Sequence, residues 1–197
     1  RIVMNRTVRD HGGKIDAVAV KSASAAIDRI IEGIPRAMDT DAIRGLEGLA
    51  AAEYFGTFNE LIVDQKEGFQ FRDRNRRPPL DPVNALLSFI YTLLAHDVRS
   101  ALETVGLDPA VGFLHRDRPG RPGLALDLME EFRPVIADRL VLSLINRRQV
   151  TARGFKHAEN GAVVMDDDTR KTVLVEYQNR KQDEVEHPYI EEKVPVG

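Results

Sequence analysis

The sequence contains no cysteine among its 197 residues. It therefore has neither a disulfide framework nor a thiolate zinc site, which fits a reducing cytoplasm and argues against secretion. No apolar run approaches the roughly 18 residues of a membrane-spanning helix, and 30% of the residues are charged. The first residues, Arg1 to Asn5, do not form a signal-peptide pattern. We therefore expect a cytoplasmic protein that is not embedded in a membrane.

Several motifs of nucleotide and small-molecule enzymes are also missing. The chain has no glycine-rich phosphate loop, no dinucleotide-binding fingerprint and no nucleophile elbow. Its formal net charge of −3 gives no overall attraction to nucleic acid. Any binding of a polyanion must therefore depend on a local basic surface.

The hydrophobic periodicity that is present is helical over most of the chain. It predicts helices over residues 3–12, 17–33 and 41–62, a buried helix beginning at Asp81-Pro82, a short helix ending near Gly106, and a helix over 124–146 that is kinked at Pro134. The runs 162–165 and 172–175 suggest one short β-hairpin, although the second run is equally compatible with a helix. The expected fold class is mainly α, a multi-helix catalytic domain with at most one short hairpin near 162–175.

Glu47 is the most informative residue of the expected 41–62 helix. The apolar residues of that helix recur with a period of 3.6, and Glu47 falls among them, on the side that should face inward. A buried carboxylate without a partner costs several kcal/mol or more, so it must be paired, protonated or bound to a cation. The pattern predicts a carboxylate that needs a cation.

Further acids and a histidine follow from separate elements. Asp127 and Glu130 lie three residues apart in a predicted helix, so both point to one side, and His115 lies just upstream across a loop. An isolated pair of acids is more often a solvated surface feature, but Glu47 and His115 favour a shared site. Carboxylate oxygens with one imidazole suit Mg²⁺ or, better, Mn²⁺.

Two arginine-rich loops point to a phosphate-bearing ligand. Such runs are usually solvated surface, yet these two lie near the proposed metal site, and guanidinium groups bind phosphate in a bidentate geometry. With no nucleotide-binding loop in the chain, nucleic acid is a better candidate than ATP. The residues that we expect to contact a DNA backbone are Arg72, Arg74, Arg76 and Arg77 in the first loop and Arg116, Arg118 and Arg121 in the second.

Four motifs, taken in order, resemble one known family, the CRISPR-associated spacer-acquisition integrase that is the first-numbered Cas protein. The resemblance covers roughly residues 1–181, and four motifs in sequence are highly specific. They are Gly45-Leu46-Glu47-Gly48-x-Ala50-Ala51-x-x-Tyr54-Phe55, Arg76-x-Pro78-Pro79-x-Asp81-Pro82-x-Asn84-x-Leu86-Leu87-Ser88, Gly106-Leu107-Asp108-Pro109-x-x-Gly112-Phe113-Leu114-His115 and Leu126-Asp127-x-x-Glu130-Glu131-Phe132-Arg133-Pro134.

The resemblance implies a helical catalytic lobe that holds one divalent ion between Glu47, His115 and Glu130, with Asp127 as a nearby acid. It implies a DNA endonuclease and integrase that inserts short foreign DNA into a CRISPR array, in which a 3′-hydroxyl attacks a phosphodiester of the repeat. It also implies double-stranded DNA, a homodimer of the full-length protein and the small second-numbered Cas protein as partners. The small β-rich domain with which family members begin has no counterpart here. Position 1 is not Met and the chain finishes abruptly, so we expect residues 1–197 to be the catalytic lobe of a longer protein.

Two alternatives remain open on the residues alone. The same site would serve a hydrolytic nuclease acting on branched or single-stranded DNA, with water as the nucleophile. From a different class, the chain would be a non-catalytic helical adaptor in which Glu47 and His115 pair with Arg44 or Arg133 in a structural polar network. Strand joining separates the first alternative from an integrase, and Mn²⁺-dependent stabilisation separates the second.

Overall fold

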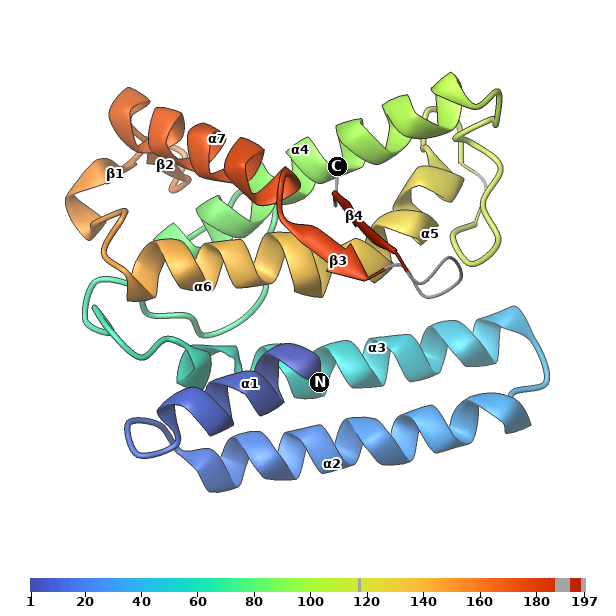
Figure 1. Ribbon diagram of the computed structural model, residues 1–197, viewed down its shortest axis with the longest axis horizontal. Coiled ribbons are helices and arrows are strands. Elements are labelled where there is room, and N and C mark those ends of the chain that lie inside the picture. Colours follow the sequence, from blue (N-terminus) through green and yellow to red (C-terminus); the bar gives the residue numbers. More distant parts are fainter. Residues whose placement is uncertain (117, 187–191, 196–197) are drawn as a thin grey trace.

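The computed structural model describes residues 1–116, 118–186 and 192–195. Helices form most of this structure and two short antiparallel hairpins complete it (Figure 1). The α-helices are α1 (Ile2–His11), α2 (Ala17–Gly33), α3 (Thr40–Gly56), α4 (Pro82–Thr104), α5 (Gly123–Phe132), α6 (Arg139–Asn146) and α7 (Asp167–Lys181). A π-helical segment, Arg133–Asp138, joins α5 to α6, and 3₁₀ turns occupy Ile34–Arg36, Phe58–Leu61 and Ala152–Gly154.

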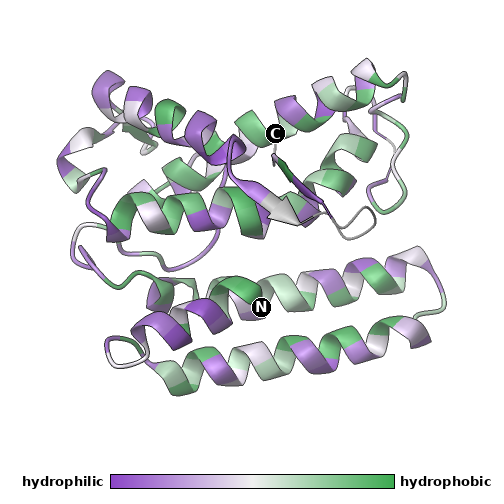
Figure 2. Cartoon of the chain, viewed as in Figure 1, coloured by the Kyte–Doolittle hydropathy of each residue, from purple (hydrophilic) through white to green (hydrophobic). Residues whose placement is uncertain are grey.

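The helices form two layers. In Figure 1, α1, α2 and α3 make one layer, and α4, α5, α6 and α7 make the other. Figure 2 shows hydrophilic and hydrophobic residues alternating along α2 and α3, as expected of helices with one packed and one solvated side. The functional site described below lies between the layers.

Aspartate side chains begin four of the helices. Each caps its helix by accepting a hydrogen bond from a free backbone N–H group of the first turn, at 2.8 to 3.1 Å. These N-cap residues are Asp16 of α2, Asp39 of α3, Asp81 of α4 and Asp166 of α7. Pro82 follows Asp81 at the first helical position, where a missing N–H costs nothing. The capping signals therefore set the start of both helices that bound the site, α3 and α4.

The predicted helices are confirmed, with two changes of extent. The helix that begins at Pro82 runs unbroken to Thr104, so the separate short helix expected to end near Gly106 is the last part of α4. The expected 41–62 helix stops at Gly56 and continues as a 3₁₀ turn. Pro134 does not end the 124–146 helix. It lies in the π-helical segment, and the wider turn accommodates the residue that lacks an N–H.

The first run of the suggested hairpin is a strand, and for the second run the helical alternative is the correct one. β2 (Val163–Met165) pairs with β1 (Phe155–His157), which precedes it, whereas residues 172–175 belong to α7. Asp166 caps α7 directly after β2, so the Asp-rich turn begins a helix and does not return a strand. A second hairpin pairs β3 (Glu184–Glu186) with β4 (Lys193–Pro195).

The core centres on α4 and α6. Both helices contribute residues that are almost fully buried, among them Leu86, Ile90, Leu144 and Ile145. Tyr177 of α7 packs into the same core with 1% of its surface exposed, and its hydroxyl donates a 2.7 Å hydrogen bond to Asp97 of α4. No helix in the described ranges is both long and apolar enough to cross a membrane.

The Tyr177 contact gives a test of how α7 is held. Tyr177→Phe keeps the buried ring and removes one hydrogen bond, so we expect a loss of about 1 kcal/mol in unfolding free energy. Tyr177→Ala removes the ring as well and should cost about 3–5 kcal/mol. Urea unfolding followed by circular dichroism measures both. Equal losses in the two variants would show that ring burial does not anchor α7.

Candidate metal and DNA-binding site

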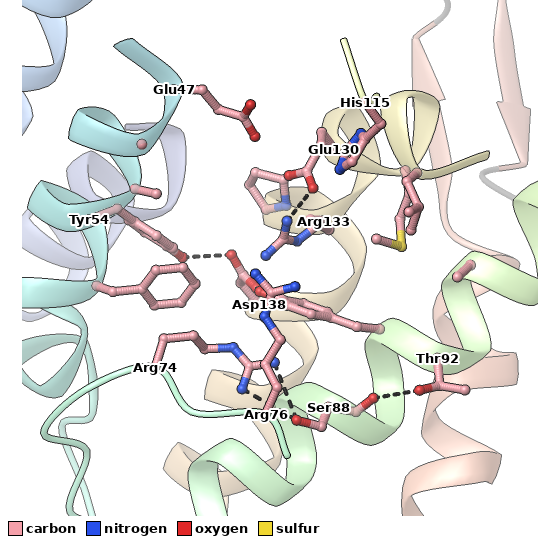
Figure 3. Close-up of a pocket in the computed structure, with 18 of the residues that line it drawn as sticks. Glu47, Tyr54, Arg74, Arg76, Ser88, Thr92, His115, Glu130, Arg133 and Asp138 are labelled. Carbon is pink, nitrogen blue, oxygen red and sulfur yellow. Dashed lines mark hydrogen bonds and ion pairs between the residues drawn. The ribbon is translucent and has the colours of Figure 1, made fainter. Parts of the chain in front are cut away.

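An open cavity of about 1060 Å³ lies between α3 on one side and α4, α5 and the π-helical segment on the other. Glu47, His115 and Glu130 all line it, although they are far apart in the sequence. Figure 3 shows the Glu47 side chain extending from α3 toward the wall that carries Glu130 and His115. The fold therefore brings the three predicted metal ligands to one cavity.

Glu47 reaches this cavity as an exposed residue, and the prediction that its carboxylate is buried is wrong. None of the residues of α3 is fully buried, because the inward side of the helix borders the open cavity instead of packing against α5. The periodicity correctly placed Glu47 on the inner side of α3. It could not show that this side faces solvent.

Asp127 fixes the loop that carries His115. The two carboxylate oxygens accept hydrogen bonds from the backbone N–H groups of Phe113, Leu114 and His115, at 2.6 to 3.0 Å, and Asp127 Oδ1 lies 2.6 Å from His115 Nδ1. This contact occupies Nδ1, so Nε2 is the ring nitrogen that remains to bind a metal ion. A carboxylate on the far nitrogen is the common arrangement behind metal-binding histidines.

The pKa of Asp127 reflects these contacts. Burial would raise it, but the hydrogen bonds from His115 and from the three backbone N–H groups outweigh burial and lower the pKa below its ordinary value of 3.8. The carboxylate is therefore ionised over the whole neutral range, which keeps it an acceptor.

Two glycines allow this loop to approach α5. A side chain at Gly112 would place its Cβ 2.8 Å from the backbone of Gly123 and 2.9 Å from Asp127 Oδ2. Such distances are shorter than real Cβ atoms tolerate, so only glycine fits between the loop and the carboxylate that holds it.

Asp41 joins the same loop to α3. Arg116 donates two hydrogen bonds to Asp41, at 2.7 and 2.8 Å. Arg44 pairs with Asp41 as well and donates a 2.7 Å hydrogen bond to the carbonyl oxygen of Leu114. These contacts connect the residue that follows His115 to the first turns of the helix that carries Glu47, and so set the two sides of the cavity relative to each other.

Glu130 faces a different partner. Its carboxylate pairs with Arg133 one turn later, and the Arg133 guanidinium lies over the Tyr91 ring, 4.3 Å from the centroid. Burial alone would lower the pKa of Arg133, but Tyr91 and Glu130 outweigh it and raise the pKa. Arg133 is thus a permanent cation beside one of the predicted metal ligands.

Below Arg133 lies a polar group that the sequence did not predict. Asp138, 2% exposed, accepts a hydrogen bond from Tyr54 at 2.9 Å (Figure 3). It accepts a second one from Tyr91 at 2.5 Å. Burial raises the pKa of Asp138, and it raises the pKa of both tyrosines. The sequence did contain a signal for the Tyr54 part of this group, because Tyr54 lies seven residues after Glu47 and so on the same face of α3.

The arginine loops contribute most of the cavity's charge. Six of the seven predicted DNA-backbone residues line the cavity, and Arg72 does not. Among the described residues the wall contains ten arginines and three acids, a formal excess of 10 − 3 = +7, in a chain whose net charge is −3. The ten are Arg1, Arg44, Arg74, Arg76, Arg77, Arg99, Arg116, Arg118, Arg121 and Arg133.

The donor set fits a divalent cation, but it does not form a compact cluster. Two carboxylates and an imidazole whose second nitrogen is held by an acid are suitable ligands for Mn²⁺ or Mg²⁺. Among the described residues, no group of three or more histidine, aspartate or glutamate side chains lies close enough to hold an ion together. Glu130 is paired with Arg133 and Glu47 extends from the opposite wall, so ligation would require side-chain movement.

Comparison with known proteins identifies the family. The family model described as "CRISPR associated protein Cas1" matches residues 1–179. The chain belongs to the Cas1 family. It is 55% identical over 197 residues to the CRISPR-associated endonuclease Cas1 1 of Chlorobaculum tepidum, and 57% identical over 201 residues to the CRISPR-associated endonuclease Cas1 2 of Rhodospirillum rubrum. Both matches cover 100% of this chain and 57% and 58% of those Cas1 proteins, so the chain spans somewhat more than half of their length.

Solved structures share the fold. A Cas1 protein from Thermotoga maritima matches with a TM-score of 0.77 and 29% identity over 98% of this chain and 58% of that one. A casposase bound to its integration product matches with a TM-score of 0.72 and 31% identity over 80% and 44%. A partial Cas6-RT-Cas1–Cas2 complex matches with a TM-score of 0.78 and 26% identity over 91% and 54%. The helical arrangement described above is therefore that of Cas1 proteins.

Asp127 provides a test of the loop that carries His115. Asp127→Asn leaves one oxygen to accept the hydrogen bonds that two now accept, so we expect a loss of about 1–3 kcal/mol in unfolding free energy at pH 7. Because the folded pKa of Asp127 lies below its unfolded value, the ionised form stabilises the fold above about pH 4, and this contribution is lost as the pH falls through the folded pKa.

The difference between wild type and Asp127→Asn should therefore narrow below about pH 4. Urea unfolding at pH 7, 5, 4 and 3 measures it. A difference that stays constant over this range would show that the ionised carboxylate does not hold the loop.

Proposed function

We propose that this chain is the catalytic part of a metal-dependent Cas1 DNA endonuclease and integrase, which inserts short foreign DNA into a CRISPR array. One observation carries the proposal: in a Cas1 family member, Glu47, His115 and Glu130 line one cavity whose wall holds ten arginines. The proposed reaction is attack by the 3′-hydroxyl of an incoming strand on a phosphodiester of the repeat, which releases another 3′-hydroxyl.

Glu47, His115 and Glu130 are the proposed ligands of Mg²⁺ or Mn²⁺. When bound, such an ion supplies Lewis-acid stabilisation of phosphoryl oxygens and favours deprotonation of the attacking hydroxyl. Asp127 acts on His115 by holding its loop and its Nδ1, so that the other nitrogen faces a ligand in one orientation. Arg133, fixed against Tyr91, is paired with Glu130; when Glu130 serves as a metal ligand, Arg133 is a cation for the negative charge that grows on the phosphorane oxygens.

The substrate is proposed to be double-stranded DNA, bound by its backbone. Because the chain has a net charge of −3, binding of DNA needs a local basic surface, and the excess of arginine in the cavity wall supplies it. Phosphates are the same in every DNA sequence, so these arginines give affinity and position with little sequence preference.

The proposed partners are a second copy of the full-length protein and Cas2. The likeness to a chain of a Cas1–Cas2 complex supports the latter. We further propose that residues 1–197 form one helical catalytic domain and that the protein acts in the cytoplasm.

A hydrolytic nuclease is the nearest alternative, since water could replace the 3′-hydroxyl at the same site. A pre-cut duplex ending in a 3′-hydroxyl separates the two, because an integrase converts it into a longer joined strand and a nuclease only shortens it. Likeness to a casposase bound to its integration product favours joining.

The adaptor alternative expected Glu47 and His115 to pair with Arg44 or Arg133. In the described part of the chain, Arg44 pairs with Asp41, Arg133 with Glu130, and His115 with Asp127, and Glu47 has no ion pair within 4.0 Å. The adaptor alternative needs Glu47 as a structural partner, but Glu47 is exposed to the cavity.

Removal of single ligands tests the metal assignment. Glu47→Gln and His115→Ala should each abolish strand joining and nuclease activity in the full-length protein, because each removes one ligand of the ion. Glu47 is exposed and forms no ion pair with the residues that the structure describes, so Glu47→Gln should leave the fold and the melting temperature without metal nearly unchanged. Circular dichroism, strand-transfer assays and melting with 1–5 equivalents of Mn²⁺ measure these effects. If both variants retain joining activity and stabilisation by Mn²⁺, the assignment is wrong.

The arginines of the first loop test the backbone-binding assignment. Neutralising Arg76 and Arg77 together to Gln should weaken binding to all duplexes alike and reduce the slope of log K against log salt by about 0.9 for each lost phosphate contact. Fluorescence anisotropy on a repeat duplex and on a random duplex at several salt concentrations measures this. A double variant that binds random DNA normally and loses only its preference for the repeat would mean that the loop reads bases.

A further inference from the structure

Arg74 differs from the other arginines of its loop. Arg72, Arg76 and Arg77 are exposed, whereas Arg74 is half-buried and lies against α4 (Figure 3). Its guanidinium donates to Asn84 Oδ1 at 2.7 Å and to Ser88 Oγ at 3.2 and 3.3 Å, and it lies 5.3 Å from the centre of the Tyr91 ring. The surroundings fix this guanidinium in the cavity wall, so it is not a freely moving surface charge.

All these contacts of Arg74 are with neutral groups. Within the described residues no carboxylate lies within 4.0 Å of its guanidinium, and its Nε atom is buried without a hydrogen-bond partner. The other buried ionic groups of the cavity are compensated, since Arg133 pairs with Glu130 and Asp138 accepts from two tyrosine hydroxyls. A half-buried charge without a counter-ion is costly, and an anion in the cavity would supply one.

The neighbouring groups favour an anion of more than one oxygen. Ser88 Oγ accepts both contacts from Arg74, so its own O–H remains available to donate. Arg76 lies beside it in the cavity wall. The pKa of Arg74 is lowered, chiefly by burial; the charges of Arg76 and Arg133 add to this effect, whereas Tyr91 and Asp138 oppose it.

These groups lie apart from the predicted metal ligands. In Figure 3, Arg74, Arg76 and Ser88 occupy one end of the cavity, while Glu47, His115 and Glu130 occupy the other, with Asp138 and Arg133 between them. A single phosphate on the proposed ion would therefore not use Arg74. A chain of phosphates that runs along the cavity would.

We propose that Arg74 and Ser88 form a second phosphate subsite, which holds a phosphodiester of the bound DNA strand away from the reacting one. The proposal rests on the proposed function, because that function supplies a strand of regularly spaced phosphates. Arg74 and Ser88 are positioning residues: they fix the register of the strand and do not touch the reacting atoms.

The first experiment does not involve DNA. Thermal melting of the wild-type chain in inorganic phosphate, with sodium chloride at matched ionic strength as the reference, should show a rise in melting temperature specific to phosphate. Arg74→Gln should lose most of this rise. The matched control is Arg147→Gln, which removes the same charge at an exposed position after α6 that does not line the cavity, and should keep it.

The second experiment uses duplex DNA. Arg74→Gln should weaken binding about tenfold or more, as expected for one lost hydrogen bond to a charged group, and Arg147→Gln should not. Single methylphosphonate linkages, scanned along one strand, should identify a position whose neutralisation weakens wild-type binding but no longer weakens that of Arg74→Gln. Such coupling assigns Arg74 to one phosphate.

Two further variants keep the test decisive if Arg74→Gln fails to fold, since Arg74 also anchors its loop on Asn84. Arg74→Lys keeps the charge but loses the planar fork, so it should retain the salt slope and bind several-fold more weakly. Ser88→Ala should lose part of the phosphate-specific stabilisation and remain folded. Unchanged DNA affinity and phosphate response in both variants would overturn the subsite. Absence of DNA binding by the wild type, with the phosphate response intact, would instead count against the proposed function.

Discussion

The Asp127 carboxylate is the contact on which the site depends most. It accepts three consecutive backbone N–H groups from the loop 113–115 and holds His115 by the ring as well. A loop that lacks regular structure has few other ways to satisfy its backbone donors, and one anion satisfies three. The same contact requires glycine at position 112, where a Cβ would approach this carboxylate within 2.9 Å. The glycine at position 112, the conformation of the loop 113–115 and the orientation of the His115 ring therefore all depend on the Asp127 carboxylate.

A second constraint is the concentration of charge in one place. The chain is acidic overall, yet the described residues of the cavity wall have a formal excess of seven positive charges. Several of these arginines are held in fixed positions by acids outside the cavity, as Arg116 and Arg44 are by Asp41. The acids thus orient guanidinium groups while the remaining arginines keep the potential positive. A surface of this kind attracts a polyanion without making the whole protein adhere to nucleic acid.

The sequence predicted the helices well, because capping residues and a 3.6-residue period are local signals. The start predicted at Asp81-Pro82 is that of α4, and α3 begins at Thr40, one residue before the predicted 41–62 helix. The sequence left strand and helix open for residues 172–175, because a short apolar run such as Val173-Leu174-Val175 fits either structure. The N-cap at Asp166 decides for the helix. The exposure of Glu47 could not be predicted from the sequence either. Periodicity reports which side of a helix is inward, whereas exposure depends on how closely the opposite layer approaches.

The predicted metal ligands lie around one cavity without touching one another, and the spacing of the motifs does not explain this separation. Two carboxylates in one cavity repel each other unless a cation lies between them. In this structure Arg133 pairs with Glu130 and lies over the Tyr91 ring, and Tyr91 in turn donates a hydrogen bond to the buried Asp138. Glu130 therefore already has a cation partner on its own wall of the cavity, and Glu47 extends from the opposite wall. The buried network that the sequence did not predict therefore explains why the ligand set lies around one cavity without closing into a compact cluster.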